Sequence, residues 1–197
     1  MSMENARIGF AFCGSYCTYS SAMAALEQVA ARWSEVTPIV AESGVVTDTR
    51  FGEAHAWMME MERITGRRPL TSIKEVEPIG PKKLLDALVI CPCTGNTLGK
   101  LANGIADTCV TMAAKSHLRN GRPVILAVST NDGLAGAAEN IGKLLARRDF
   151  YFVPFRQDDP AGKPRSLVAD FTLVPQTVSA ALNGQQIQPL ILGPAGC

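Results

Sequence analysis

The sequence has none of the patterns that assign a chain to a membrane or to nucleic acid. No apolar stretch is long enough to span a bilayer. The net charge is only +1, so the chain is not expected to attract nucleic acid or an anionic membrane surface through its overall charge. The first residues also lack the basic segment and long apolar run of a secretion signal. We therefore expect a cytoplasmic protein that binds neither membrane nor nucleic acid.

Residues that bind metals are sparse as well. The chain contains two histidines, and the spacing of Cys91 and Cys93 is not the C-x-x-C spacing of metal or redox pairs. The six cysteines are expected to be free thiols that pack as small apolar residues in a reducing compartment. We predict no metal site.

The chain instead shows a regular alternation of apolar strand patterns and helical patterns. Continuous apolar strands separated by helices are typical of a parallel sheet with helices on both faces. We therefore predict an α/β fold, with a single domain over residues 1–197, a three-layer Rossmann-like or flavodoxin-like parallel sheet, and a disordered tail at 193–197. The expected strands are 7–13, 35–41, 86–91, 123–129 and 150–155, and the expected helices are 18–33, 52–64, 95–103, 107–119, 134–147 and 173–183.

The segment 88–108, LVICPCTGNTLGKLANGIADT, carries the most chemical information. An apolar strand pattern breaks at Pro92, turns through small and hydroxylated residues, and gives way to a helical pattern from about Leu98. Open α/β sheets bind ligands at the loops that connect the carboxyl ends of strands to the following helices. The unpaired N–H groups and the dipole at the start of the helix favour an anionic or electron-rich ligand there.

Two other turns after predicted strands have similar chemistry. In the first, Gly14 lets a ligand approach the backbone and the hydroxyls of Ser15 and Thr18 can bind a phosphate, although a tight turn with a helix cap explains the same residues. The dinucleotide fingerprint G-x-G-x-x-G is absent. In the second, Asn131 offers a donor and an acceptor beside a plain turn signal. Because the ends of parallel strands meet at one edge of a sheet, we predict that Ser15, Thr94 and Asn131 line one cleft.

The charged residues outside these turns give a less specific signal. Most lysines and arginines are solvated surface groups, and this is the default here. Arg50 and the polar segment 156–165 are nevertheless candidates for carboxylate contacts, with the segment acting as a mobile clamp that binds through its arginines. His55 lies on a helical pattern, where a lone histidine is more often structural than catalytic.

The motif from Pro92 to Asp107 supports a family resemblance. PCTGNTLGKLANGIAD resembles the P-A-S-A-N-T-x-x-K-x-A-N-G-I-A-D motif of the flavoprotein family, the homo-oligomeric flavin-containing cysteine decarboxylases. In that family this loop holds flavin mononucleotide (FMN), and the glycine-serine turn after the first strand holds the flavin phosphate. The resemblance therefore implies an FMN site and a homo-oligomer. With the hydroxyl of Thr18 added, the candidate cofactor-binding residues are Gly14, Ser15, Thr18, Thr94, Asn96 and Thr97.

The sequence departs from the decarboxylases after the next strand. Their substrate-binding motif is P-x-M-N-x-x-M-W, and this chain has VSTNDGLA from Val128 to Ala135, in which only Asn131 is retained. This departure argues against cysteine decarboxylation. His55 falls in the broad region that supplies the catalytic histidine of the family. The resemblance thus makes Asn131 and His55 the candidate catalytic residues.

A second resemblance covers about residues 6–192. Segments such as TRFGE, PIGPK, RNGRPVILAVSTNDGL and VPFRQDDP are similar to the B-subunit family of the dipicolinate synthases of spore-forming bacteria. The resemblance implies an oxidoreductase subunit of sporulation, located in the cytoplasm of the mother cell. It would dehydrogenate dihydrodipicolinate, a cyclic dicarboxylate, to pyridine-2,6-dicarboxylate together with an A subunit that binds NADP. The candidate carboxylate contacts are then Arg50, Arg156 and Arg165.

The residues leave several alternatives open. The chain could be a stand-alone FMN-dependent decarboxylase, or a binding subunit without a cofactor. Within the dehydrogenase hypothesis, a flavin in the cleft could take a hydride from the ring. The cleft could instead bind only the substrate and leave redox chemistry to the partner, since residues that hold a flavin and residues that hold a flat pyridine ring look alike in a sequence.

Overall fold

Five parallel strands form the centre of the molecule, in the order β2-β1-β3-β4-β5. The structure is a computed structural model that describes residues 5–193. The strands are β1 (Arg7–Phe12), β2 (Glu35–Val40), β3 (Ala87–Cys93), β4 (Val124–Thr130) and β5 (Phe150–Phe152). This order is the flavodoxin-like arrangement, in which the chain reverses its direction of travel across the sheet between β1 and β3. The connections that follow β1 and β3 therefore lead to helices on opposite faces of the sheet. The gap between these connections leaves room for a ligand.

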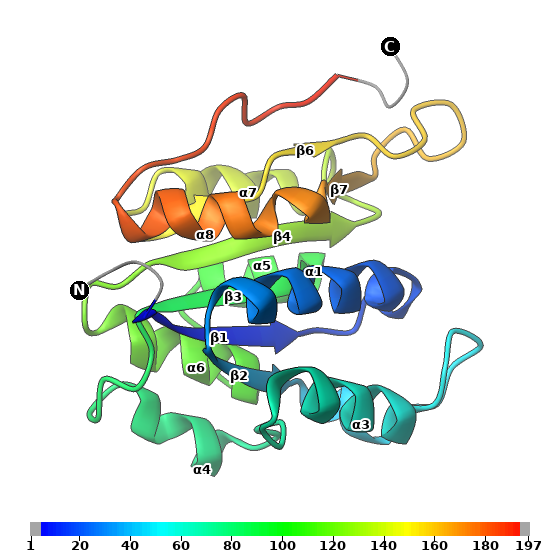
Figure 1. Cartoon of the computed structure of the whole chain (residues 1–197). Helices are drawn as coiled ribbons and strands as arrows, with labels where there is room; N and C mark the ends of the chain where they lie inside the picture. The colour runs from blue at the N-terminus through cyan, green and yellow to red at the C-terminus, as the bar shows by residue number, and fades with distance from the viewer. Residues whose placement is uncertain (1–4, 194–197) are drawn as a thin grey trace.

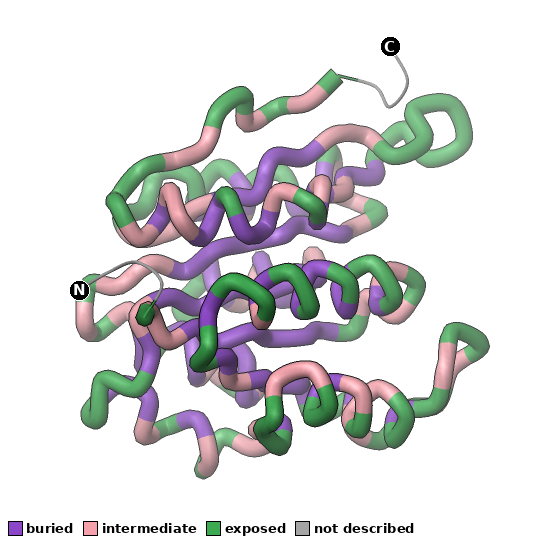
Figure 2. The backbone as a smooth tube through the Cα atoms, viewed as in Figure 1, coloured by how far each residue is buried: buried purple, intermediate pink, exposed green. Residues whose placement is uncertain are grey.

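The sheet is buried because its strands are almost continuously apolar. Every residue of β3 is buried, and so is every residue of β4 except Thr130 (Figure 2). Such strands require cover on both faces. Helices α1 (Tyr19–Arg32), α3 (Ala54–Thr65) and α8 (Val174–Leu182) lie on one face, and α5 (Gly95–Ala102), α6 (Cys109–Leu118) and α7 (Ala138–Leu145) lie on the other (Figure 1). The described residues also contain two short α-helices, α2 (Glu42–Val46) and α4 (Ile73–Val76).

The predicted α/β fold with helices on both faces of a mostly parallel sheet is confirmed, with one correction to the sheet. Strands β6 (Phe155–Arg156) and β7 (Leu167–Ala169) are antiparallel, and β7 pairs with the end of β4. A single strand was predicted at 150–155, but the chain leaves β5 after Phe152. It then turns back through the polar segment 157–166, which is how consecutive antiparallel strands are connected.

The predicted helix boundaries agree with those of the observed helices, except at α7. That helix was expected from residue 134 and begins at Ala138, because turns bonded to the Asp132 carbonyl occupy the preceding residues. The extent of the single domain stays a prediction. Of the tail predicted to be disordered, only Gly193 belongs to the described residues, and 194–197 lie outside them. No helix within 5–193 is long and apolar enough to cross a membrane.

Candidate functional site

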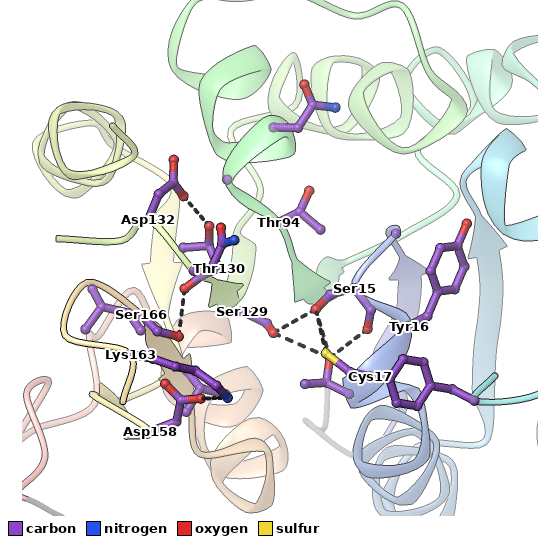
Figure 3. A pocket seen from close by; sticks show the side chains of 18 of the residues that line it. Ser15, Tyr16, Cys17, Thr94, Ser129, Thr130, Asp132, Asp158, Lys163 and Ser166 are labelled. Carbon is purple, nitrogen blue, oxygen red and sulfur yellow. Dashed lines mark hydrogen bonds and ion pairs between the residues drawn. The ribbon is translucent and has the colours of Figure 1, made fainter. Parts of the chain in front are cut away.

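A cavity of about 640 Å³ lies at the carboxyl ends of the central strands. Its floor comes from the turns that follow β1, β3 and β4. The loop before α3 and the loop between β6 and β7 add residues from either side, and Figure 3 shows the side chains that converge on it. The volume falls within the range of small-molecule and cofactor sites. The described residues thus form a ligand-sized cleft at the position that the fold class predicts.

Three hydroxyl groups cluster at the base of the cavity. The Ser15 and Ser129 Oγ atoms are 2.9 Å apart (Figure 3). The Thr18 hydroxyl donates to the Ser15 carbonyl oxygen at 2.9 Å. The Thr18 Oγ1 atom also lies 3.5 Å from the Ser129 Oγ atom. Gly14 beside them leaves open space, because a Cβ placed there would meet nothing closer than 3.9 Å. Hydroxyl donors beside a backbone segment that no side chain covers suit a phosphate or another anion.

Gly95 brings two strand-end loops into close contact. A Cβ built at this position would lie 2.7 Å from both the Thr130 Oγ1 and the Asp132 Oδ1 atoms. The Thr130 hydroxyl donates to the Asp132 carboxylate, which holds both groups against the first turn of α5 (Figure 3). A side chain at residue 95 would therefore displace the Asp132 carboxylate from the cavity wall.

The loop after β3 is fixed by a cap and by a buried hydroxyl. The Thr94 Oγ1 atom accepts from the Thr97 backbone N–H at 3.2 Å and caps α5. The Thr97 hydroxyl turns inward and donates to the Cys13 sulfur at 3.2 Å. Burial raises the pKa of the Cys13 thiol to about 11, so this sulfur stays protonated and structural. Asn96, between the two threonines, is exposed and lines the cavity.

Most of the predicted site residues meet in this cavity. Ser15, Thr94 and Asn131 share it, as the order of the strands led us to expect. The predicted residues that line it are Gly14, Ser15, Thr18, Arg50, Thr94, Asn96 and Asn131.

Four predicted residues do not line the cavity. Thr97 is buried behind it, and His55 is exposed on α3. Arg156 lies in a neighbouring cavity of about 470 Å³, where its guanidinium donates to the Asp170 carboxylate at 2.9 Å. Arg165 is exposed and lines neither cavity. Their functional roles stay predictions.

The sequence analysis did not single out several groups that line the cavity. Tyr16 faces it from one side, and Asp158 and Lys163 form an ion pair of 3.1 Å on the other (Figure 3). Lys163 lies in the same polar segment as Arg165, and nothing in the order of residues distinguishes a side chain that turns inward from one that turns outward. No strand was predicted at β7, and the apolar residues Leu167 and Val168 are the signal in the sequence that could have indicated it.

The chain matches a known protein family and known proteins over most of its length. The sequence profile of the Flavoprotein family matches residues 2–155. The B subunit of dipicolinate synthase from Bacillus subtilis is 44% identical over 191 residues, which cover 97% of this chain and 96% of that protein. The crystal structure of the corresponding B subunit from Bacillus halodurans covers 98% of this chain and 100% of its own, with a TM-score of 0.90 and 42% identity.

More distant structures share the fold. The crystal structure of the FMN-dependent cysteine decarboxylase SpaF covers 92% of this chain and 98% of its own, with a TM-score of 0.65 and 22% identity. The same fold is therefore compatible with a largely different sequence. The profile match over more than half of the chain and the two relatives above 40% identity show that this chain belongs to the flavoprotein family.

Proposed function

We propose that this chain is the B subunit of a dipicolinate synthase. It would dehydrogenate a cyclic dihydropyridine dicarboxylate to pyridine-2,6-dicarboxylate together with an A subunit that carries NADP. The observation that supports this most is the 44% identity to the Bacillus subtilis protein over 97% of the chain. The match covers 97% of the chain and so includes the segments that line the cavity, and we expect the ligand chemistry to be similar.

The cavity suits a planar anion with hydrogen-bonding edges. It offers the cationic Arg50, the amides of Asn96 and Asn131, and the hydroxyl cluster of Ser15 and Ser129. A ring dicarboxylate needs cationic or N–H donors for its carboxylates and a flat slot for the ring. In this proposal Asn131 contacts the ring or a carboxylate.

The same residues fit a flavin mononucleotide. Gly14 leaves open space beside the hydroxyls of Ser15 and Thr18, which would hold the phosphate, and Thr94 and Asn96 would hold the remainder of the cofactor. A flavin supplies a reversible acceptor of hydride. The protein's part is to bind and orient the reactants at the strand ends, where the carboxylates of Asp132 and Asp158 also line the cavity. The role of His55, which is exposed and outside both cavities, stays a prediction.

The resemblance also leads us to propose a homo-oligomer in the cytoplasm of a sporulating mother cell. Helix α3 is the candidate contact surface. Its Met59 and the nearby Phe51 are large apolar side chains that are 56% and 42% exposed, and a second copy of the chain would remove them from water. Light scattering on the purified protein measures the assembly directly.

One set of measurements tests the proposed function. The chain is purified alone and with its A subunit, and the absorbance of pyridine-2,6-dicarboxylate is followed with dihydropyridine substrate generated in the assay. Product formation that needs both proteins supports the proposal. Carbon dioxide release from a cysteinyl substrate by the lone chain would show a decarboxylase instead. Flavin absorbance of the purified protein distinguishes a flavin-containing subunit from one that binds only substrate.

A further inference from the structure

Two cationic side chains approach the cavity from opposite sides. Arg50 belongs to the loop before α3, and Lys163 belongs to the loop between β6 and β7. Both loops project from the same end of the sheet, one on each side of the central strand ends (Figure 1). Among the described residues that line this cavity, these are the cations, because Arg156 and Arg165 lie elsewhere.

The backbone of Lys163 is held by hydrogen bonds of the loop, while its side chain is bound only through the ammonium group. Its N–H donates to the Asp159 carbonyl at 2.7 Å, and its own carbonyl accepts from the Ser166 N–H at 3.0 Å. The Ser166 hydroxyl in turn donates to the Thr130 carbonyl at 3.2 Å, which ties this loop to the end of β4 (Figure 3). The four-carbon side chain can therefore move its ammonium group without any change in the loop.

The ion pair between Lys163 and Asp158 is easily exchanged. Their Nζ and Oδ2 atoms lie 3.1 Å apart, with the side chains 61% and 30% exposed. Ion pairs this exposed contribute little stability, because water screens the charges and both side chains lose freedom. An ammonium also has three donors, of which this contact uses one. A carboxylate that enters the cavity can replace Asp158 at little cost.

Arg50 is the complementary cation. It forms no ion pair with any residue in the described range, and its guanidinium carbon lies 4.8 Å from the centre of the Phe51 ring. Stacking on an aromatic ring orients a guanidinium without using its N–H donors. Those donors stay available for a ligand carboxylate.

We propose that Lys163 and Arg50 each anchor one carboxylate of the ring, and that the ligand displaces Asp158 from Lys163. The inference rests on the proposed function, because it requires a cyclic dicarboxylate as the ligand. Two anchors on opposite sides of one cleft select rings with two carboxylates over rings with one. Lys163 is thus a specificity-determining residue, and Asp158 competes with the ligand for it.

Ligand titrations test the proposal without an activity assay. Pyridine-2,6-dicarboxylate and pyridine-2-carboxylate are titrated calorimetrically into the full-length protein. The wild type is expected to bind the dicarboxylate more tightly than the monocarboxylate. Lys163→Met should weaken dicarboxylate binding about tenfold, as expected for one hydrogen bond between charged groups, and should remove most of the preference. Lys163→Arg keeps the charge and should keep the preference.

Two further variants separate this role from a structural one. Asp158→Asn removes the competing partner and should tighten dicarboxylate binding by about threefold, since an exposed pair contributes less than about 1 kcal/mol. Lys74→Met is the matched control, the same substitution at an exposed lysine of α4 that lines neither cavity, and it should change nothing. Thermal unfolding of each variant checks that the loop remains folded.

The other outcomes overturn the proposal in distinguishable ways. If Lys163→Met keeps the preference of the wild type, Lys163 is not an anchor. If Lys163→Met and Asp158→Asn weaken binding equally, the pair serves only the structure of the loop. A loss of affinity for FMN but not for riboflavin in Lys163→Met would assign the lysine to a phosphate. A wild type that binds neither pyridine ring contradicts the proposed function itself.

Discussion

The Ser15 and Ser129 side chains are joined by a hydrogen bond of 2.9 Å although 114 residues separate them in the chain. Ser15 follows β1 and Ser129 lies near the carboxyl end of β4, so the bond spans the end of β3 that lies between these strands. It places two hydroxyls beside the open backbone at Gly14. This pair is the observation behind our proposal that a phosphate binds at the base of the cavity.

Ser15→Ala is expected to weaken FMN binding about tenfold, because one hydrogen bond to a charged phosphate is lost. Riboflavin has the same ring system without the phosphate, and its affinity should change little. Fluorescence titration of the protein with each flavin gives both values. An equal loss for the two flavins would place the phosphate elsewhere.

Asn96→Leu should abolish flavin binding and leave the fold intact, since Asn96 is exposed at the start of α5 and lines the cavity. The expected result is a colourless protein whose melting temperature differs from that of the wild type by no more than about 2 °C. Gln176→Leu is the control, an exposed amide on α8 outside both cavities. Binding retained by Asn96→Leu would count against the site assignment.

Gly95→Ala should reduce both stability and ligand binding. The added methyl group would lie 2.7 Å from the Thr130 and Asp132 side chains, so we expect a loss of about 2 kcal/mol in the free energy of unfolding. Gly99→Ala in the same helix is the matched control. Its nearest neighbour would be the Asn140 Nδ2 atom at 3.6 Å, an ordinary contact, and alanine favours helix by up to about 1 kcal/mol. The midpoint of urea unfolding should therefore be lower than that of the wild type for Gly95→Ala and higher for Gly99→Ala.

His117 should make the protein less stable in mild acid. It is fully buried, its Nε2–H donates to the Pro123 carbonyl, and burial lowers its pKa to about 4. The unfolded chain binds a proton at the ordinary pKa of about 6.5, so the stabilising effect of a neutral histidine is complete above about pH 6.5 and decreases as the pH falls toward 4. By about pH 4 the loss approaches about 3 kcal/mol.

Urea unfolding at about pH 7.5, 6 and 5 measures this dependence. His117→Gln can still donate to the Pro123 carbonyl and has no proton to gain in this range. The variant should be less stable than the wild type in the most alkaline sample, because it fills the buried space less well. Its free energy of unfolding should nevertheless fall less as the pH is lowered. Parallel curves for the two proteins would show that another group causes the acid sensitivity.

The sequence by itself determined the fold class and the three strand-end turns. Continuous apolar runs at 86–91 and 123–129 can only be buried on both faces, and the carboxyl ends of such parallel strands meet at one edge. That argument was enough to bring Ser15, Thr94 and Asn131 into one cleft, and the structure agrees. The motif from Pro92 to Asp107 was enough to identify the family.

Only the tertiary structure decided the direction of individual side chains. Thr97 lies in the family motif but turns inward to Cys13, and its neighbour Asn96 faces the cavity. Likewise Lys163 reaches the cavity while Arg165 does not, because the loop between β6 and β7 is fixed by bonds to the distant end of β4. Such contacts join residues far apart in the chain. Local patterns contain no information on which side of an irregular loop will face the cleft.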